Sequence, residues 1–382
     1  MTQHYDALVI GAGIHGLCSA WALKRAGVER IAILERQDFG HDRGSSHGTS
    51  RITRSTYSDA SYVRLMQAAH DHAWPALADD LGQTLITPRA MCLFGPEAGP
   101  IQDYQRAVVE AGAPVEQLTS DQARARFPDF SFEARTVVLD DPTAGVIAAQ
   151  RTMEGLARWL QSQGVVLFTR VAVEGVRDIG SAVHVRADRD DFQASRCVIT
   201  AGAWTGQLLP VAAPRLTPIR QTVAYFEVTG PAGQQRAENL PVWVYVGETQ
   251  NEVFYGLPQF GRPGIKIARH VTAGAASDPD GDRAVQSEKV EDVRQMAERL
   301  FALPLGACVG SETCLYTNTA TEDVIWDLHP ESRRIAIGSG FSGHGFKFGP
   351  LSGQILAELA LTGTSTVPEF EAHRHRFALL NR

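Results

Sequence analysis

The sequence predicts an α/β fold of two domains, one with a parallel sheet and helices and the other an inserted domain with an antiparallel sheet. A chain of 382 residues is too long for one ordinary core. Residues 5–35 show the strand, helix and strand pattern of a βαβ unit. Strand-like runs that suit the same sheet lie between residues 165 and 210, whereas residues 217–270 form a separate strand-rich block. The parallel sheet is therefore expected to be assembled from distant parts of the chain.

The first of two glycine-rich loops has the context of a dinucleotide-binding site. GAGIHG follows the apolar run YDALVI, precedes the helical pattern LCSAWALKRAG, and the next apolar run ends in Glu35, nineteen residues after Gly16. A carboxylate at this distance reaches the ribose hydroxyls. Gly11 permits a tight turn, Gly13 lets the backbone approach a phosphate, and Gly16 allows close contact of helix and strand. We therefore expect a pyrophosphate at the N-terminus of this helix.

The second glycine-rich loop, GSGFSG, matches the same pattern without the same context. A strand precedes it and an apolar helix follows near Pro350, but no second strand with a terminal acid remains after Leu361. It is therefore not a second dinucleotide site. His344 and Lys347 lie just before the helix, whose positive N-terminus stabilises a nearby anion. This segment is expected to approach the reactive ring of the cofactor.

The distribution of strands favours a flavin over a nicotinamide cofactor. A nicotinamide-binding domain would continue alternating strands and helices for roughly 150 residues. Here the segment after Glu35 is polar and rich in Gly and Ser, and carries Arg51 and Arg54. Separated cofactor segments are typical of a glutathione-reductase-like FAD-binding Rossmann domain with an inserted antiparallel-sheet substrate domain. The expected boundaries are 1–85, 144–216 and 310–382 for the FAD-binding domain, and 86–143 and 217–309 for the substrate domain.

Composition excludes several other classes of protein. A formal charge of −7 without a basic block argues against nucleic acid and against an anionic membrane surface. No apolar run reaches membrane-spanning length, and the N-terminus lacks the features of a signal peptide. The five cysteines are scattered, which indicates reduced thiols and a cytoplasmic location. No cysteine or histidine cluster has zinc-ligand spacing, so no metal is expected.

Five segments resemble motifs of the monomeric sarcosine oxidase family, within the D-amino acid oxidase superfamily of FAD-dependent amine oxidoreductases. They are RGSSHGTSRITR, CVITAGAWT, FYGLPQFGRPGIKIARH, ETCLYTNTATEDVIWDLHP and GSGFSGHGFKFGP. The resemblance is strongest to the peroxisomal sarcosine/L-pipecolate oxidases, and the family pattern extends from residue 5 to about residue 350. It implies a monomer that oxidises a secondary amino acid, N-methyl or cyclic, to an imine and reduces O2 to hydrogen peroxide.

The resemblance assigns cations to the substrate and to the flavin. It implies that Arg54 and Lys347 bind the substrate carboxylate, for which a guanidinium fork is suited. It places Arg51 and Lys266 on opposite faces of the flavin, and Lys266 in electron transfer to O2. Lys266 lies between apolar residues, where burial is costly without a partner or a task.

The resemblance also assigns other groups around the ring. It implies that His270 and His344 are active-site histidines, that Tyr255 contacts substrate, and that Cys314 forms a thioether to the flavin, for which a thiolate is needed. Cys308 is the nearby alternative, but its context does not match. Trp243 and Tyr245 are expected to shape the substrate pocket, which would make sarcosine itself a doubtful substrate. The remaining expected cofactor contacts are Ile14, His15, Arg36, Ser46, His47, Ser50, Gly340, Gly343, Gly345 and Phe346.

Three alternatives to an oxidase of N-methyl or cyclic amino acids stay open from the sequence. One is a dehydrogenase of the same fold that uses an acceptor other than O2, against which Lys266 argues. Another is an oxidase of glycated or other N-substituted amino acids. The third is a flavin- or nucleotide-binding sensor without turnover, which the clustered cations disfavour.

Overall fold

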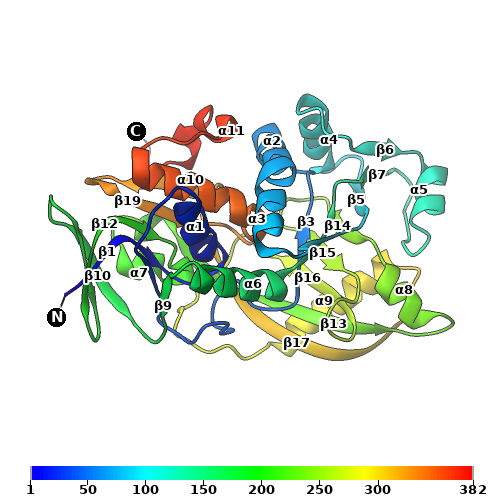
Figure 1. The fold of residues 1–382 in the computed structure, drawn as a ribbon. Coiled ribbons are helices and arrows are strands. Elements are labelled where there is room, and N and C mark those ends of the chain that lie inside the picture. The colour runs from blue at the N-terminus through cyan, green and yellow to red at the C-terminus, as the bar shows by residue number, and fades with distance from the viewer. Residues whose placement is uncertain (1, 381–382) are drawn as a thin grey trace.

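The structure, a computed structural model, describes residues 2–380, within which three sheets are formed (Figure 1). The first sheet contains five parallel strands in the order β9-β2-β1-β12-β19. Antiparallel β18 extends it beyond β19, and the β10–β11 hairpin pairs with the first half of β12. The strands are β1 (Gln3–Ile10), β2 (Ile31–Leu34), β9 (Val166–Phe168), β10 (Val173–Asp178), β11 (Val183–Ala187), β12 (Asp191–Ile199), β18 (Ile325–His329) and β19 (Ser332–Ser339).

The parallel strands come from three distant parts of the chain, as predicted. Strand β1 is apolar on both faces because both are covered. Ala7 and Val9 belong to a core shared with helices α1 and α10, whereas Leu8 and Ile10 pack with the β11 side of the sheet. The helices that contribute to the first of these cores include α1 (Ile14–Arg25), α2 (Ala60–Ala68), α3 (Trp74–Leu81), α6 (Ala149–Ser162) and α10 (Gly349–Thr362). The predicted fold class, α/β with a Rossmann-type sheet, is confirmed.

Helices α1 and α10 pack directly against each other, and this brings the two glycine-rich loops together (Figure 1). A Cβ atom on Gly353 would collide with the backbone of Cys18, and one on Gly349 would lie 2.6 Å from Cγ1 of Ile14. Glycine at these positions lets the backbones approach. The segments before the two helices therefore reach the same region of the molecule.

The second sheet has eight strands in the order β17-β13-β16-β15-β14-β5-β7-β6. All neighbours are antiparallel except β14 and β5. Its strands are β5 (Met91–Pro96), β6 (Glu116–Leu118), β7 (Thr136–Asp141), β13 (Thr217–Val228), β14 (Val242–Val246), β15 (Val253–Leu257), β16 (Ile265–His270) and β17 (Leu305–Asn318). One face packs on an apolar core that includes residues of α5 (Ser120–Arg126), α8 (Gly233–Asn239) and α9 (Ser287–Leu300).

A small third sheet connects the two larger ones. It contains β3 (Ser50–Thr53), β8 (Gly145–Ala148) and β4 (Ile86–Pro88) in antiparallel pairing. The remaining helices are α4 (Ile101–Glu110), α7 (Thr205–Leu208) and α11 (Pro368–Glu371), and a π-helical turn, Ala69–Ala73, joins α2 to α3. We propose that the two large sheets are the centres of the two expected domains, although β17 continues past the expected boundary at residue 310.

Candidate active site

One large cavity of about 1230 Å³ extends from the first glycine-rich loop to the second sheet. Its wall includes Gly13 of the first glycine-rich loop, Glu35 just after β2, Lys266 and Cys314 of the second sheet, and Lys347 just after the second glycine-rich loop. Typical small-molecule sites measure about 300–1,000 Å³. A cavity of this size and extent fits a long cofactor together with a small substrate.

The N-terminal end of the cavity has the geometry of a dinucleotide cradle. Gly11 has φ +97°, a conformation that favours glycine. The buried carboxylate of Glu35 accepts backbone N–H groups from Ala12 at 2.8 Å and from Gln37 at 2.9 Å, so it is fixed beside the loop. Helix α1 has no side-chain cap at Gly13. Gly13, Ile14 and His15 line the cavity, so the positive N-terminus of α1 faces it and suits an anion, and Oγ of Ser46 accepts the N–H of Ile14 at 3.1 Å.

Gly16 does not line the cavity, and its role is packing. A Cβ atom there would collide with the carbonyl oxygen of Gly11 and lie 2.8 Å from Oγ1 of Thr200. This is the close contact of helix and strand that the motif predicts. The other expected cofactor contacts do line the cavity; they are Gly11, Gly13, Ile14, His15, Glu35, Arg36, Ser46, His47, Ser50, Arg51, Cys314, Gly340, Gly343, His344, Gly345, Phe346 and Lys347.

Lys266 and Arg51 form a cationic region in the middle of the cavity wall. Lys266 is 5% exposed, and its ammonium donates to the carbonyl oxygen of Ser50 at 3.3 Å. Burial and the charge of Arg51 lower the pKa of Lys266 to about 7, while the carboxylate of Glu312 opposes this shift. The guanidinium of Arg51 is held by the carbonyl oxygens of Ser45, His47 and Ser50 at 2.6–2.8 Å.

A second pair of cations, Arg54 and Lys347, lies near the C-terminal glycine-rich loop. The ammonium of Lys347 is buried and donates to the hydroxyl of Tyr57 at 3.2 Å and to the carbonyl oxygen of His344 at 2.9 Å. Burial and Arg54 lower the pKa of Lys347 well below its usual range. Nη1 of Arg54 is buried without a hydrogen-bond partner among the described residues. A buried ammonium beside a half-buried guanidinium that has an unpaired donor suits a carboxylate ligand.

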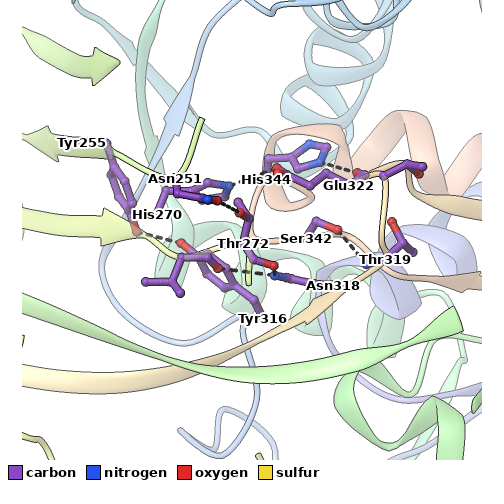
Figure 2. A network of polar contacts seen from close by, with 12 residues as sticks. Asn251, Tyr255, His270, Thr272, Tyr316, Asn318, Thr319, Glu322, Ser342 and His344 are labelled. Carbon is purple, nitrogen blue, oxygen red and sulfur yellow. Dashed lines mark hydrogen bonds and ion pairs between the residues drawn. The ribbon is translucent and has the colours of Figure 1, made fainter. Parts of the chain in front are cut away.

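A polar network joins the two predicted active-site histidines through Glu322 (Figure 2). Nε2 of His344 lies 3.0 Å from the carbonyl oxygen of Glu322, and Nε2 of His270 lies 3.3 Å from its carboxylate. Glu322 has φ +61°, which is uncommon for a residue other than glycine. The hydroxyls of Tyr255 and Tyr316 lie 3.0 Å apart on the same cavity wall.

The expectation that Trp243 and Tyr245 shape the pocket is wrong. Both side chains belong to the apolar core on the far face of the second sheet, where Trp243 packs against Phe301 and the hydroxyl of Tyr245 accepts from Arg299 at 2.8 Å. Residues alternate between faces along a strand. The neighbours on β14, Val244 and Val246, therefore line the cavity instead.

Cys314 lines the cavity, whereas Cys308 is exposed on the same strand and lies outside the cavity wall. Burial raises the pKa of the Cys314 thiol, and the charges of Arg51 and Lys266 oppose this shift. The two cations are the groups that would favour the thiolate that a thioether link requires.

Several cavity residues were not predicted from the sequence. They are Tyr57, Tyr104, Tyr316, Glu312 and Glu322. The available signals were the place of Tyr316 in the quoted motif ETCLYTNTATEDVIWDLHP, two residues after Cys314, and the place of Tyr57 three residues after RGSSHGTSRITR ends at Arg54. Among residues 2–380, no group of three or more His, Cys, Asp or Glu side chains is arranged to hold a metal ion, and no helix is long and apolar enough to cross a membrane.

The fold and the cavity together define a flavoprotein oxidoreductase with an FAD-binding Rossmann domain. Unpaired buried atoms of His15 and His47, the N-terminus of helix α1 and the glycine cradle fit the phosphates and polar groups of that cofactor. The sequence matches the family model described as DAO, FAD dependent oxidoreductase, over residues 6–359. The chain belongs to that family.

Individual relatives agree with this assignment and with the resemblance found in the sequence. The human peroxisomal sarcosine oxidase is 33% identical over 94% of this chain and 92% of its own. The monomeric sarcosine oxidase of Bacillus sp. strain B-0618 is 29% identical over 95% of this chain and 94% of its own. The solved structure of NikD, an amino acid oxidase of nikkomycin biosynthesis, superposes with a TM-score of 0.82 at 21% identity, covering 99% of this chain and 98% of its own.

Replacing Gly16 with alanine is expected to abolish retention of FAD. The new methyl group meets the backbone oxygen of Gly11, which cannot move without opening the phosphate-binding turn. The measurement is the flavin absorbance per chain of purified protein. Gly175→Ala is the matched control because a Cβ atom there meets nothing within 4 Å. Full flavin content in Gly16→Ala would contradict the packing role.

Proposed function

We propose that this protein is an FAD-dependent oxidase of a secondary amino acid, N-methyl or cyclic, that forms an imine and hydrogen peroxide. The observation that carries the proposal is the pair of cations, the buried Lys347 and the half-buried Arg54, in the same cavity as the dinucleotide cradle and Lys266. The sarcosine oxidase relatives support the substrate class. The imine hydrolyses in water after release.

The proposed roles follow from charge and position. Arg54 and Lys347 bind the substrate carboxylate and orient the amino acid in the cavity. Nearby cations lower the pKa of the substrate amine, so that it loses its proton and its lone pair becomes available. FAD, when bound, supplies the two-electron acceptor for oxidation of the C–N bond. Lys266 holds positive charge where negative charge develops on O2.

The remaining cavity wall determines which substrates fit. Tyr255, Tyr316 and His270 contribute polar and aromatic surface, and Val244 and Val246 contribute smaller apolar surface. Since Trp243 and Tyr245 point away, aromatic bulk on β14 does not exclude a small substrate such as sarcosine.

A substrate screen tests the proposed function. The purified enzyme is incubated under air with sarcosine, other N-methyl amino acids, L-proline, L-pipecolate and glycated amino acids, and hydrogen peroxide is measured. Peroxide release with an N-methyl or cyclic amino acid supports the proposal. Flavin bleaching without peroxide would instead indicate a dehydrogenase, and absence of bleaching with every amino acid would indicate a protein without this activity.

Replacing Cys314 with serine is expected to leave FAD removable by acid. In the proposed link, the sulfur of Cys314 forms a thioether to the flavin, and a serine hydroxyl at the same place lacks the nucleophilicity to form it. The measurement is the partition of yellow colour between precipitate and supernatant after acid precipitation. Cys308→Ser is the control and should keep its flavin in the precipitate. Flavin that stays with precipitated Cys314→Ser would end the proposed linkage.

Two further properties concern the oligomeric state and the location of the protein. We infer a monomer, because the bacterial relative is named as one, and a cytoplasmic location, because all five cysteines are free. Light scattering of the purified protein measures the first, and fractionation of the source cells measures the second.

A further inference from the structure

Tyr57 lies beside both cations of the proposed carboxylate site and is buried in the cavity wall. The centre of its ring is 4.5 Å from the guanidinium carbon of Arg54 and 5.5 Å from the ammonium nitrogen of Lys347. Its side chain is also one of the partners of His344. We propose that Tyr57 is a positioning residue, which holds Arg54, Lys347 and His344 in the arrangement that binds the substrate carboxylate. This inference rests on the proposed function.

The partners of His344 determine which group donates in the hydrogen bond between His344 and Tyr57. A carbonyl oxygen only accepts, so Nε2 of His344 must donate to the carbonyl of Glu322 at 3.0 Å. Burial and the charge of Lys347 lower the pKa of His344 well below its usual range, which leaves the ring neutral. Nδ1 of His344 therefore accepts, and the hydroxyl of Tyr57, 3.3 Å away, donates to it.

The same hydroxyl oxygen also accepts a hydrogen bond from the ammonium of Lys347. The ammonium donates to it at 3.2 Å and to the carbonyl oxygen of His344 at 2.9 Å. Burial raises the pKa of Tyr57, so the phenol keeps its proton and remains a donor toward His344. Two of the three N–H groups of Lys347 are thus fixed, and the third remains for a ligand in the cavity.

Tyr57 also reduces the mutual repulsion of the two cations. The charge of Arg54 acts against the protonated form of Lys347. The face of an aromatic ring carries negative potential and attracts a nearby cation, and a hydroxyl oxygen stabilises an ammonium that donates to it. Tyr57 provides the ring to Arg54 and the oxygen to Lys347. A site with both cations already in place binds a carboxylate without the cost of assembling them.

Packing behind Tyr57 fixes its ring. Tyr62 stacks on it at 5.3 Å between ring centres, and Phe348 lies at 5.9 Å. The hydroxyl of Tyr62 is itself held, because it accepts the backbone N–H of Val324 at 3.0 Å. Tyr62 therefore belongs to the support of the Tyr57 ring.

Replacing Tyr57 with phenylalanine tests the inference, because it removes the hydroxyl and keeps the ring. The probe is cyclopentanecarboxylate, which has no nitrogen to oxidise, titrated into the FAD-loaded enzyme by calorimetry from pH 6 to 10. We expect about tenfold weaker binding, as for one hydrogen bond to a charged group. Tyr57→Leu, which also removes the ring from Arg54, is expected to bind more weakly still.

The pH dependence of probe binding distinguishes a positioning role from a purely structural one, because a structural role would leave the midpoint unchanged. Lys347 is charged below its pKa, so binding is strong at low pH and weakens as the pH rises through that pKa. The phenolic oxygen stabilises the charged form, so its loss in Tyr57→Phe shifts the midpoint to lower pH. The groups that face Lys347 from the surrounding elements are Arg54, His344 and, more weakly, His70 on the π-helical turn.

Tyr62→Phe is the matched control, since it removes a buried phenol from the ring stacked on Tyr57. Unchanged affinity and midpoint in Tyr57→Phe, or equal changes in Tyr62→Phe, would overturn the positioning role. Arg54→Met separates this result from failure of the proposed function. If the probe binds Arg54→Met as it binds wild type, the carboxylate site itself is wrong. If Arg54→Met loses binding and Tyr57→Phe does not, only the role of Tyr57 is wrong.

Discussion

Replacing Lys266 with methionine is expected to slow the reaction of the reduced enzyme with O2 by about 10²- to 10³-fold, the usual effect of removing one preorganised charge-stabilising donor. Anaerobic bleaching by substrate should change far less, because Lys266 is assigned to the oxygen reaction and not to the carboxylate site. Stopped-flow absorbance measures the two half-reactions separately. Equal effects on both would refute the assigned role.

The surroundings of Lys266 explain why the effect should be large. The residue is 5% exposed, and among the described residues its ammonium has one hydrogen-bond partner, the carbonyl oxygen of Ser50. In such a site, water cannot replace a missing cation, and charge–charge interactions are strong. Methionine has a similar length and fills the volume without charge, so the variant isolates the charge. Lys289→Met on the exposed face of α9 is the control for loss of a lysine in general.

The pH dependence of the oxygen reaction supplies a second test of Lys266. Burial and Arg51 lower its pKa to about 7, so the ammonium is present below this pH and is lost as the pH rises through it. The rate of the oxygen reaction should therefore fall with increasing pH. A negative charge next to Lys266 during turnover moves the midpoint upward without changing the direction. Lys266→Met should lose this pH dependence, and a wild-type rate that rises with pH would contradict the assignment.

The parallel sheet was predictable because local sequence determines the βαβ unit. The apolar runs before Gly11 and Glu35 have no polar face, as expected for strands covered on both sides. Glu35 at the end of β2 then follows from the spacing. The packing of α1 on α10 was not predictable in this way, because it depends on Gly349 and Gly353 meeting residues more than 300 positions earlier.

The orientation of β14 could not be predicted from the sequence. In VWVYV every residue is buried, so both faces of the strand are apolar and no period of two remains to identify the cavity side. The larger side chains, Trp243 and Tyr245, fill the core against α9 and its neighbours, and the valines face the cavity. Tyr57 and Glu322 were missed for a different reason. Their contacts join segments far apart in the chain, and Glu322 adopts a turn conformation that no local pattern indicates.

Replacing Arg54 with methionine is expected to raise the KM for the amino acid substrate by about 10²- to 10³-fold, since removal of one member of a buried charge pair costs several kcal/mol. The guanidinium lies over the ring of Tyr57, and its Nη1 atom is buried without a partner among the described residues. A substrate carboxylate would supply that partner. Arg54→Lys should recover only part of the loss, because an ammonium keeps the charge but lacks the planar fork. Steady-state kinetics with the best substrate of the screen measures these effects.

An amine that lacks a carboxylate provides the decisive control for Arg54. Such an amine cannot use the proposed carboxylate site, so its weak reaction should be similar in wild type and in Arg54→Met. The ratio of kcat/KM for the amino acid to kcat/KM for the simple amine should therefore fall sharply in Arg54→Met. The same ratio should fall sharply in Lys347→Met. If Arg54→Met loses activity toward the amino acid and toward the simple amine together, Arg54 acts on the fold or on the cofactor. A preserved ratio would show that the carboxylate is bound by other residues.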